Sequence, residues 1–90
     1  MKYKKKPVEI EAFQYDGDLI DSDGHYYVPS WAMDAHKHGV LCFEQGEMYV
    51  KTLEGKMHVT VGNYVIQGVN GELYSCDSEI FDKTYEPVTR

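Results

Sequence analysis

Two histidines and a cysteine stand close enough in this sequence to raise the question of a metal site. His36, His38 and Cys42 are side-chain types that bind zinc. If residues 31–38 form a helix, side chains two positions apart point about 200° away from each other, so the two imidazoles cannot share one ion. A structural zinc site also needs four ligands, and the two cysteines of the chain stand in separate elements. We therefore predict no metal and no cofactor.

An acidic, turn-rich segment at residues 16–24 raises the question of calcium. An EF-hand loop requires Asp or Asn at positions 1, 3 and 5, Gly at position 6 and Glu at position 12. Counting from Asp16 puts Ile20 at position 5, and placing Gly24 at position 6 puts Leu19 at position 1, so neither register fits. We predict a solvated loop that is also the candidate contact surface for a protein partner. The predicted partner-binding residues are Asp16, Asp18, Asp21 and Asp23.

An aromatic residue and a cation two positions apart predict a binding surface for a small ligand. Tyr49 and Lys51 would lie on the same face of a strand, where the ring can stack on a base and the ammonium group can meet a phosphate. The alternative is an ordinary solvent-exposed strand face, and both interpretations stay open. The predicted ligand-binding set is Tyr49, Lys51, Trp31, Tyr74 and Lys83.

Sequence motifs for catalysis are absent. The chain has no Gly-rich phosphate loop, no nucleophile elbow and no His-Glu pair at metalloprotease spacing. An acid–base pair among four histidines and fifteen carboxylates would arise by chance in a chain this acidic. We predict a non-enzymatic protein.

The net charge of −6 is unevenly distributed along the chain. Four lysines lie within residues 1–6, which we predict to be a solvated basic tail, so residues 7–90 carry a net charge of −10. A body this acidic repels phosphate backbones, which argues against direct nucleic-acid binding. It could instead imitate a nucleic acid and occupy a basic groove on another protein.

The apolar residues predict no contact with a membrane. No apolar run approaches the roughly 18 residues that a membrane span needs, and the opening residues lack the apolar stretch of a secretory signal. We predict a cytoplasmic protein in which Cys42 and Cys76 stay reduced and serve as small core residues.

Turn residues and hydrophobic alternation predict one α+β, β-rich domain over residues 1–90. Asn70-Gly71 between two β-branched and aromatic runs favours a two-residue hairpin turn with both residues at φ > 0. Ser30 is a good N-cap for a helix over residues 31–38, with Gly39 just after its end. Trp31 and Phe81 are the predicted large core anchors of the two helices. Strands are predicted over residues 7–15, 25–28, 40–44, 47–53 and 57–61, with a further strand on either side of the Asn70-Gly71 turn and a short helix near 78–85.

Short turns between these strands require antiparallel pairing, because parallel strands need long crossovers. We therefore expect an antiparallel meander or half-barrel of about five to six strands, with a short helix near 31–38 and another near 78–85 on one open side. In the first strand, Val8, Ile10 and Ala12 are expected to share one face.

Three sequence blocks together resemble a family of small phage and prophage proteins of uncharacterised activity. They are residues 6–15 (KPVEIEAFQY), 51–55 (KTLEG) and 62–86 (GNYVIQGVNGELYSCDSEIFDKTYE), with the helix start at 28–31 between them. Asn63 and Ser75 differ from the Asp and Pro that are usual at these places, and Asp77-Ser78 replaces a Lys-Pro pair. The last change makes the start of the second helix acidic and puts an anion-binding role there in doubt.

The resemblance implies a phage-encoded accessory protein and carries over no catalytic residue. Three hypotheses stay open. The first is a counter-defence protein that sequesters a nucleotide-type immune signal, which we expect to be a homo-oligomer because packed protomers make enclosed pockets. The second is an acidic inhibitor that blocks a host nucleic-acid enzyme or CRISPR effector. The third is a structural phage module.

Overall fold

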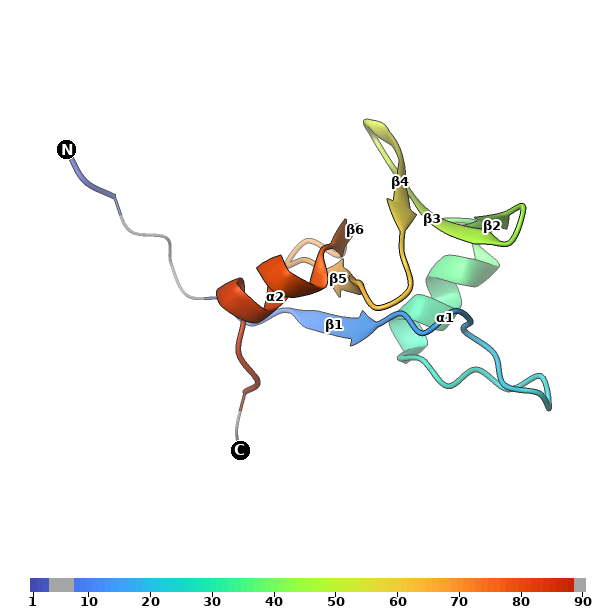
Figure 1. Cartoon of the computed structure of the whole chain (residues 1–90). Helices are drawn as coiled ribbons and strands as arrows, with labels where there is room; N and C mark the ends of the chain where they lie inside the picture. The colour runs from blue at the N-terminus through green and yellow to red at the C-terminus, as the bar shows by residue number, and fades with distance from the viewer. Residues whose placement is uncertain (4–7, 89–90) are drawn as a thin grey trace.

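The computed structural model, which describes residues 1–3 and 8–88, contains six strands and two short helices. The strands form two antiparallel sheets of three strands each. Figure 1 shows the two sheets side by side, with one helix against each. This arrangement confirms the predicted β-rich α+β class and the approximate places of both helices.

The first sheet is a meander of consecutive strands, β2 (Leu41–Glu44), β3 (Glu47–Thr52) and β4 (Gly55–Val59). Gln45 and Gly46 connect β2 to β3 with φ values of 52° and 81°. Positive φ at both central residues gives a turn whose twist matches that of the flanking strands. One face of this sheet packs on α1 (Ser30–Lys37).

The second sheet has the order β1-β5-β6, formed by β1 (Glu11–Gln14), β5 (Tyr64–Gln67) and β6 (Leu73–Cys76). The strands are therefore divided between two sheets and do not form the single curled sheet that we expected. The physical reason is a tight turn after β4, in which the N–H of Asn63 donates to the Thr60 carbonyl at 2.9 Å. It leads the chain away from β4 and toward β1, which pairs with β5.

The hairpin at Asn70-Gly71 is present, but its turn differs from the predicted one. The N–H of Gly71 donates to the carbonyl of Gly68 at 3.0 Å, and Gly68 pairs with Glu72 across three loop residues. Of the turn residues only Gly71 has a positive φ, 83°. The loop is thus a type I turn closed by a left-handed glycine, which lets Asn70 keep an ordinary conformation.

The main core lies between α1 and the first sheet. Its fully buried side chains include Leu41, Met48 and Val50 from that sheet. Ala32 and Ala35 of α1 are buried. Val8, Ile10 and Ala12 lie together, as predicted, and line a second cavity of about 1010 Å³, whereas Phe13 packs against the main core. Tyr15, two residues after Phe13, is buried in the same core.

The start of α1 corrects a second prediction. The N-cap is Pro29, and Ser30 is the first helical residue, with no side-chain hydrogen bond to the helix. Gly39 follows the helix at φ 80°, as expected of a residue that ends it. Residues 25–28 form no strand and contribute only an isolated bridge between Tyr26 and Ile20.

The second helix, α2 (Ser78–Thr84), is anchored more lightly than α1. The Asp77 side chain accepts hydrogen bonds from the N–H groups of Glu79 and Ile80, and no residue of α2 is buried. Phe81 is half-buried and is therefore not the deep core anchor that we predicted. Its ring stacks on Tyr64 at 3.8 Å between centroids and 7° between planes.

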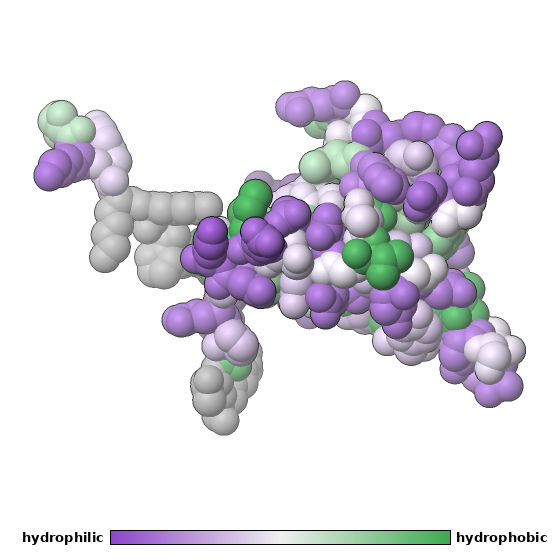
Figure 2. Space-filling view, viewed as in Figure 1, coloured by the Kyte–Doolittle hydropathy of each residue, from purple (hydrophilic) through white to green (hydrophobic). Residues whose placement is uncertain are grey.

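The surface seen in Figure 2 is mostly hydrophilic, with hydrophobic side chains in small separate patches. Leu53, Val61 and Val69 are among the exposed apolar residues. In the part of the chain that the structure describes, no helix has the length and apolar character that a membrane crossing requires.

Candidate functional site

A groove of about 890 Å³ opens between α1, the β3–β4 turn and the β5–β6 hairpin. Its walls come from both sheets, because β6 contacts β3 and β4. Volumes of roughly 300–1,000 Å³ are typical of ligand sites. The apolar part of its lining is formed by Trp31, Ala35, Val40, Leu53, Met57, Leu73 and Tyr74.

Trp31 is the largest side chain in the groove and the only tryptophan of the chain. It is half-buried, and its ring packs against Phe13 with centroids 5.6 Å apart. Its indole Nε1 is buried and has no hydrogen-bond partner within residues 1–3 and 8–88. A buried polar group without a partner is costly, so the packing around Trp31 must supply the stability that this N–H does not.

The rim of the groove carries an excess of negative charge. Asp34, Glu54 and Glu72 line it, together with a single lysine, Lys51, so these four side chains sum to −2. None of the four makes an ion pair with another described residue. His38 is also present, and its Nδ1 lies 2.8 Å from the Asp34 carbonyl oxygen.

Glu72 owes its position to a glycine on the same hairpin. Gly68 lies directly beneath the Glu72 side chain, and a Cβ at position 68 would overlap the Glu72 carboxylate. The absence of a side chain at Gly68 therefore leaves room for this charge at its place on the rim.

Three of the five predicted ligand-binding residues meet in this groove: Trp31, Lys51 and Tyr74. The other two, Tyr49 and Lys83, do not line it. Tyr49 and Lys51 share one face of β3, as predicted, since Met48 and Val50 are buried on the opposite face. The Lys56 ammonium group lies over Tyr49, 5.3 Å from its ring centroid, and the ring of His58 lies 5.2 Å away.

Tyr74 links the groove to α2. Its hydroxyl lies 3.4 Å from that of Tyr85, and this hydrogen bond, with burial as a second cause, raises the pKa of Tyr74 to about 12. The phenol is therefore neutral at physiological pH and presents an uncharged ring to the groove.

The acidic loop uses its carboxylates to hold its own backbone. Asp16 Oδ1 accepts from the Tyr27 hydroxyl at 2.6 Å, and Asp18 Oδ1 accepts from the Leu19 N–H at 2.8 Å. Asp21 Oδ1 accepts from the N–H groups of Asp23 and His25 at 3.0 and 2.9 Å. Of the four predicted partner-binding residues, only Asp23 accepts no hydrogen bond from another described residue.

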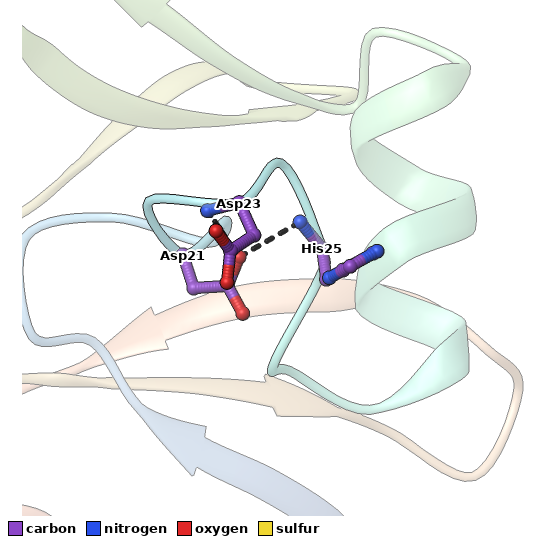
Figure 3. A group of neighbouring side chains, drawn as sticks. All are labelled: Asp21, Asp23 and His25. Atoms are coloured by element: carbon purple, nitrogen blue, oxygen red, sulfur yellow. Dashed lines mark hydrogen bonds between the residues drawn. The ribbon is translucent and has the colours of Figure 1, made fainter.

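The loop also brings together three side chains that sequence spacing did not single out. Asp21, Asp23 and His25 each offer one ligand atom within 4.8 Å of the others, and Figure 3 shows the two backbone N–H groups that converge on Asp21. All three residues are exposed. The Asp21 Oδ1 atom already accepts two backbone hydrogen bonds. The cluster is therefore better explained as a hydrogen-bonded turn than as a metal site.

The histidines and cysteines considered for zinc make separate contacts. His36 Nδ1 lies 2.9 Å from the Tyr26 hydroxyl, and His38 bonds to its own helix. Both cysteines are free thiols and half-buried. Burial, with the nearby Asp77 carboxylate as a second cause, raises the pKa of Cys76 and so disfavours a reactive thiolate.

Sequence reasoning missed the three rim carboxylates because they lie 20 and 18 residues apart in the chain, at 34, 54 and 72. Each belongs to a different element, and only the packing of the two sheets brings them to one groove.

The chain matches no protein-family model, and no curated protein or solved structure is significantly similar to it. Its function must therefore be argued from the groove itself.

Proposed function

We propose that this protein is a non-catalytic binding protein, which acts by binding another molecule and thereby blocking it. The groove between its two sheets is the proposed binding surface. The observation that carries the proposal is the convergence of three segments, from α1, the β3–β4 turn and the β5–β6 hairpin, on one apolar cavity. Its titratable groups are three carboxylates, a lysine, a histidine and the neutral phenol of Tyr74, without a nucleophile beside a base. Such a site suits binding better than turnover.

The resemblance to small phage proteins supplies the setting for this proposal. A phage-encoded binding protein without catalysis would act in the bacterial cytoplasm by blocking a component of host defence. The net charge of −10 over residues 7–90 supports a basic protein surface as its target, because opposite charges steer association and favour the correct partner. We therefore place inhibition of a host defence protein first.

Sequestration of a nucleotide-type signal is the second candidate. Trp31 and Tyr74 could stack on a base, and Lys51 stands in the same groove to meet a phosphate. The negative rim opposes this ligand, because each phosphate would face more carboxylates than cations.

A plaque assay with two matched variants tests the proposed function. Wild-type protein is expressed in bacterial strains that each carry one phage-defence system, and each strain is challenged with a phage that its system restricts. Leu53→Asp places a charge on the apolar wall of the groove, and Val61→Asp makes the same change outside it. Both side chains are exposed, so neither change should alter folding.

We expect wild type and Val61→Asp to restore plaques in at least one strain, and Leu53→Asp to fail there. Thermal denaturation of the three purified proteins checks that their folds are equally stable. The proposal would be overturned if Leu53→Asp restored plaques as well as wild type does. It would also be overturned if no form of the protein restored plaques in any strain.

A further inference from the structure

We infer that the groove takes a short protein segment that combines apolar side chains with arginine or lysine. This inference rests on the proposed function, since it names the ligand class of the same groove. Two features of the groove support it: its unpaired carboxylates and its apolar floor.

The three rim carboxylates make no interaction within the described part of the molecule that would explain their position. Asp34, Glu54 and Glu72 form no side-chain hydrogen bond or ion pair with another residue in the described ranges 1–3 and 8–88. Some carboxylates elsewhere on the surface are engaged within the molecule: Glu44 pairs with Lys56, and Asp16 with Tyr27. Three unpaired carboxylates around one cavity favour a cationic ligand, because each can accept charge-assisted hydrogen bonds from a guanidinium or ammonium group.

The floor between these charges requires an apolar body in the ligand. Trp31, Met57 and Leu73 line the groove and are the residues we call its apolar floor; Leu53 lines it as well, with a side chain that is 108% exposed. Aromatic and aliphatic pockets of this kind bury the anchor side chains of a binding partner. A ligand that carried only positive charge would leave this floor in contact with water.

A nucleotide fits the same groove less well. Its phosphates would approach a rim whose four charged side chains sum to −2, with Lys51 as the single cation. A protein segment with alternating apolar and basic residues satisfies both the floor and the rim.

Tryptophan fluorescence gives a direct measurement of occupancy. Since Trp31 is the only tryptophan and lines the groove, a change in its emission reports binding there without a label. The probes are a peptide of alternating leucine and arginine, a peptide of the same length with leucine and glutamate, ATP, and a cyclic dinucleotide. Titrations at low and high salt test the electrostatic part of the affinity.

Matched charge variants separate the rim from the rest of the acidic surface. Glu54→Gln combined with Glu72→Gln neutralises two rim carboxylates, and Glu79→Gln combined with Glu86→Gln neutralises two exposed carboxylates near α2. We expect the leucine–arginine peptide to shift Trp31 emission and to bind the rim variant about two- to tenfold more weakly than wild type. The α2 variant should bind it as wild type does, and added salt should weaken binding.

Four results would overturn the inference. The first is equal binding of the acidic and basic peptides, and the second is equal weakening by both pairs of substitutions. The third is tighter binding of ATP or the cyclic dinucleotide than of the basic peptide, strengthened by the rim substitutions. That third result would leave the groove as the binding site and retain the proposed function with its second ligand class. Failure of every probe to shift Trp31 emission would also reject the cationic segment, and the plaque assay would then decide the function separately.

Discussion

Two acidic regions of this molecule, the loop at residues 16–23 and the rim of the groove, use the same chemical group in opposite ways. In the loop, Asp16, Asp18 and Asp21 turn their carboxylates toward nearby N–H and hydroxyl groups of the same segment. On the rim, the carboxylates come from three distant segments and are left without partners in the described chain. The density of acidic residues along the sequence therefore does not indicate which of them are available to another molecule.

The difference teaches that carboxylates close together in the sequence stabilise local structure more readily than they bind partners. Asp side chains reach their own backbone two residues on and form turns, which uses up their hydrogen-bonding capacity. Carboxylates that meet only through tertiary packing have no such local competitor. The following predictions test this comparison, from the largest expected effect to the smallest.

The groove should owe its stability to its apolar floor. Trp31→Ala removes a half-buried ring that packs against Phe13 and the core, so we expect it to lower the free energy of unfolding by about 3 kcal/mol. Leu53→Ala is the control, because this side chain lines the same groove but is fully exposed and should cost almost nothing. Urea denaturation of both variants measures the difference, and equal small effects would mean that Trp31 does not support the groove.

The loop should owe its stability to one carboxylate. Asp21→Ala removes the acceptor of two backbone N–H groups, in the manner of a lost helix cap, and should cost about 1–2 kcal/mol in urea denaturation. Asp23→Ala, two residues on, should be nearly neutral because its carboxylate accepts no hydrogen bond from the described residues. Equal effects at the two positions would contradict the distinction between engaged and free carboxylates.

The hydrogen bond between Tyr27 and Asp16 should give the loop a defined pH window. This bond lowers the pKa of Asp16, with the Asp18 N–H as a second cause, and raises the pKa of Tyr27 to about 12. Its contribution is complete above the unfolded Asp pKa of about 3.9 and below the unfolded Tyr pKa of about 10. It is lost as the pH falls through the folded pKa of Asp16, or rises from about 10 through 12.

The stability difference between wild type and Tyr27→Phe measures this bond. We expect the difference to be constant between about pH 4 and pH 10 and to vanish on both sides of that window. A difference that persists unchanged at strongly acidic pH would show that the Tyr27 hydroxyl stabilises the loop by another contact.

The rim carboxylates should contribute least to stability. Neutralising all three, by Asp34→Asn, Glu54→Gln and Glu72→Gln, should change the free energy of unfolding by no more than about 0.5 kcal/mol, as for surface substitutions that break no contact. A loss as large as that of Asp21→Ala would show that the rim carboxylates have structural partners and are not free for a ligand.

The fold was predictable from the sequence where local signals acted alone. The turns at Gln45-Gly46 and Gly71, the helix end at Gly39 and the alternation along β3 are all local, and each appears near its predicted place. The division into two sheets was not predictable in this way. It arises because β5 pairs with β1, about 50 residues earlier in the chain, and not with β4. Tertiary packing determines which of these strands β5 pairs with.

The candidate site was predictable only in part, for a related reason. Trp31, Lys51 and Tyr74 were selected for their side-chain types, and these do not depend on the fold. Strand periodicity placed Tyr49 and Lys51 on one face, but it did not show that the Lys56 ammonium group of the neighbouring strand lies over the Tyr49 ring. Cross-strand neighbours depend on register, which a single strand does not reveal.

A substitution at Gly68, which has no side chain, could change the ligand preference of the groove. Any side chain there would push the Glu72 carboxylate aside and relocate one unit of negative charge, while Trp31 and the rest of the apolar floor stayed in place. One substitution at a position outside the lining of the groove could thus retune ligand preference without rebuilding the cavity.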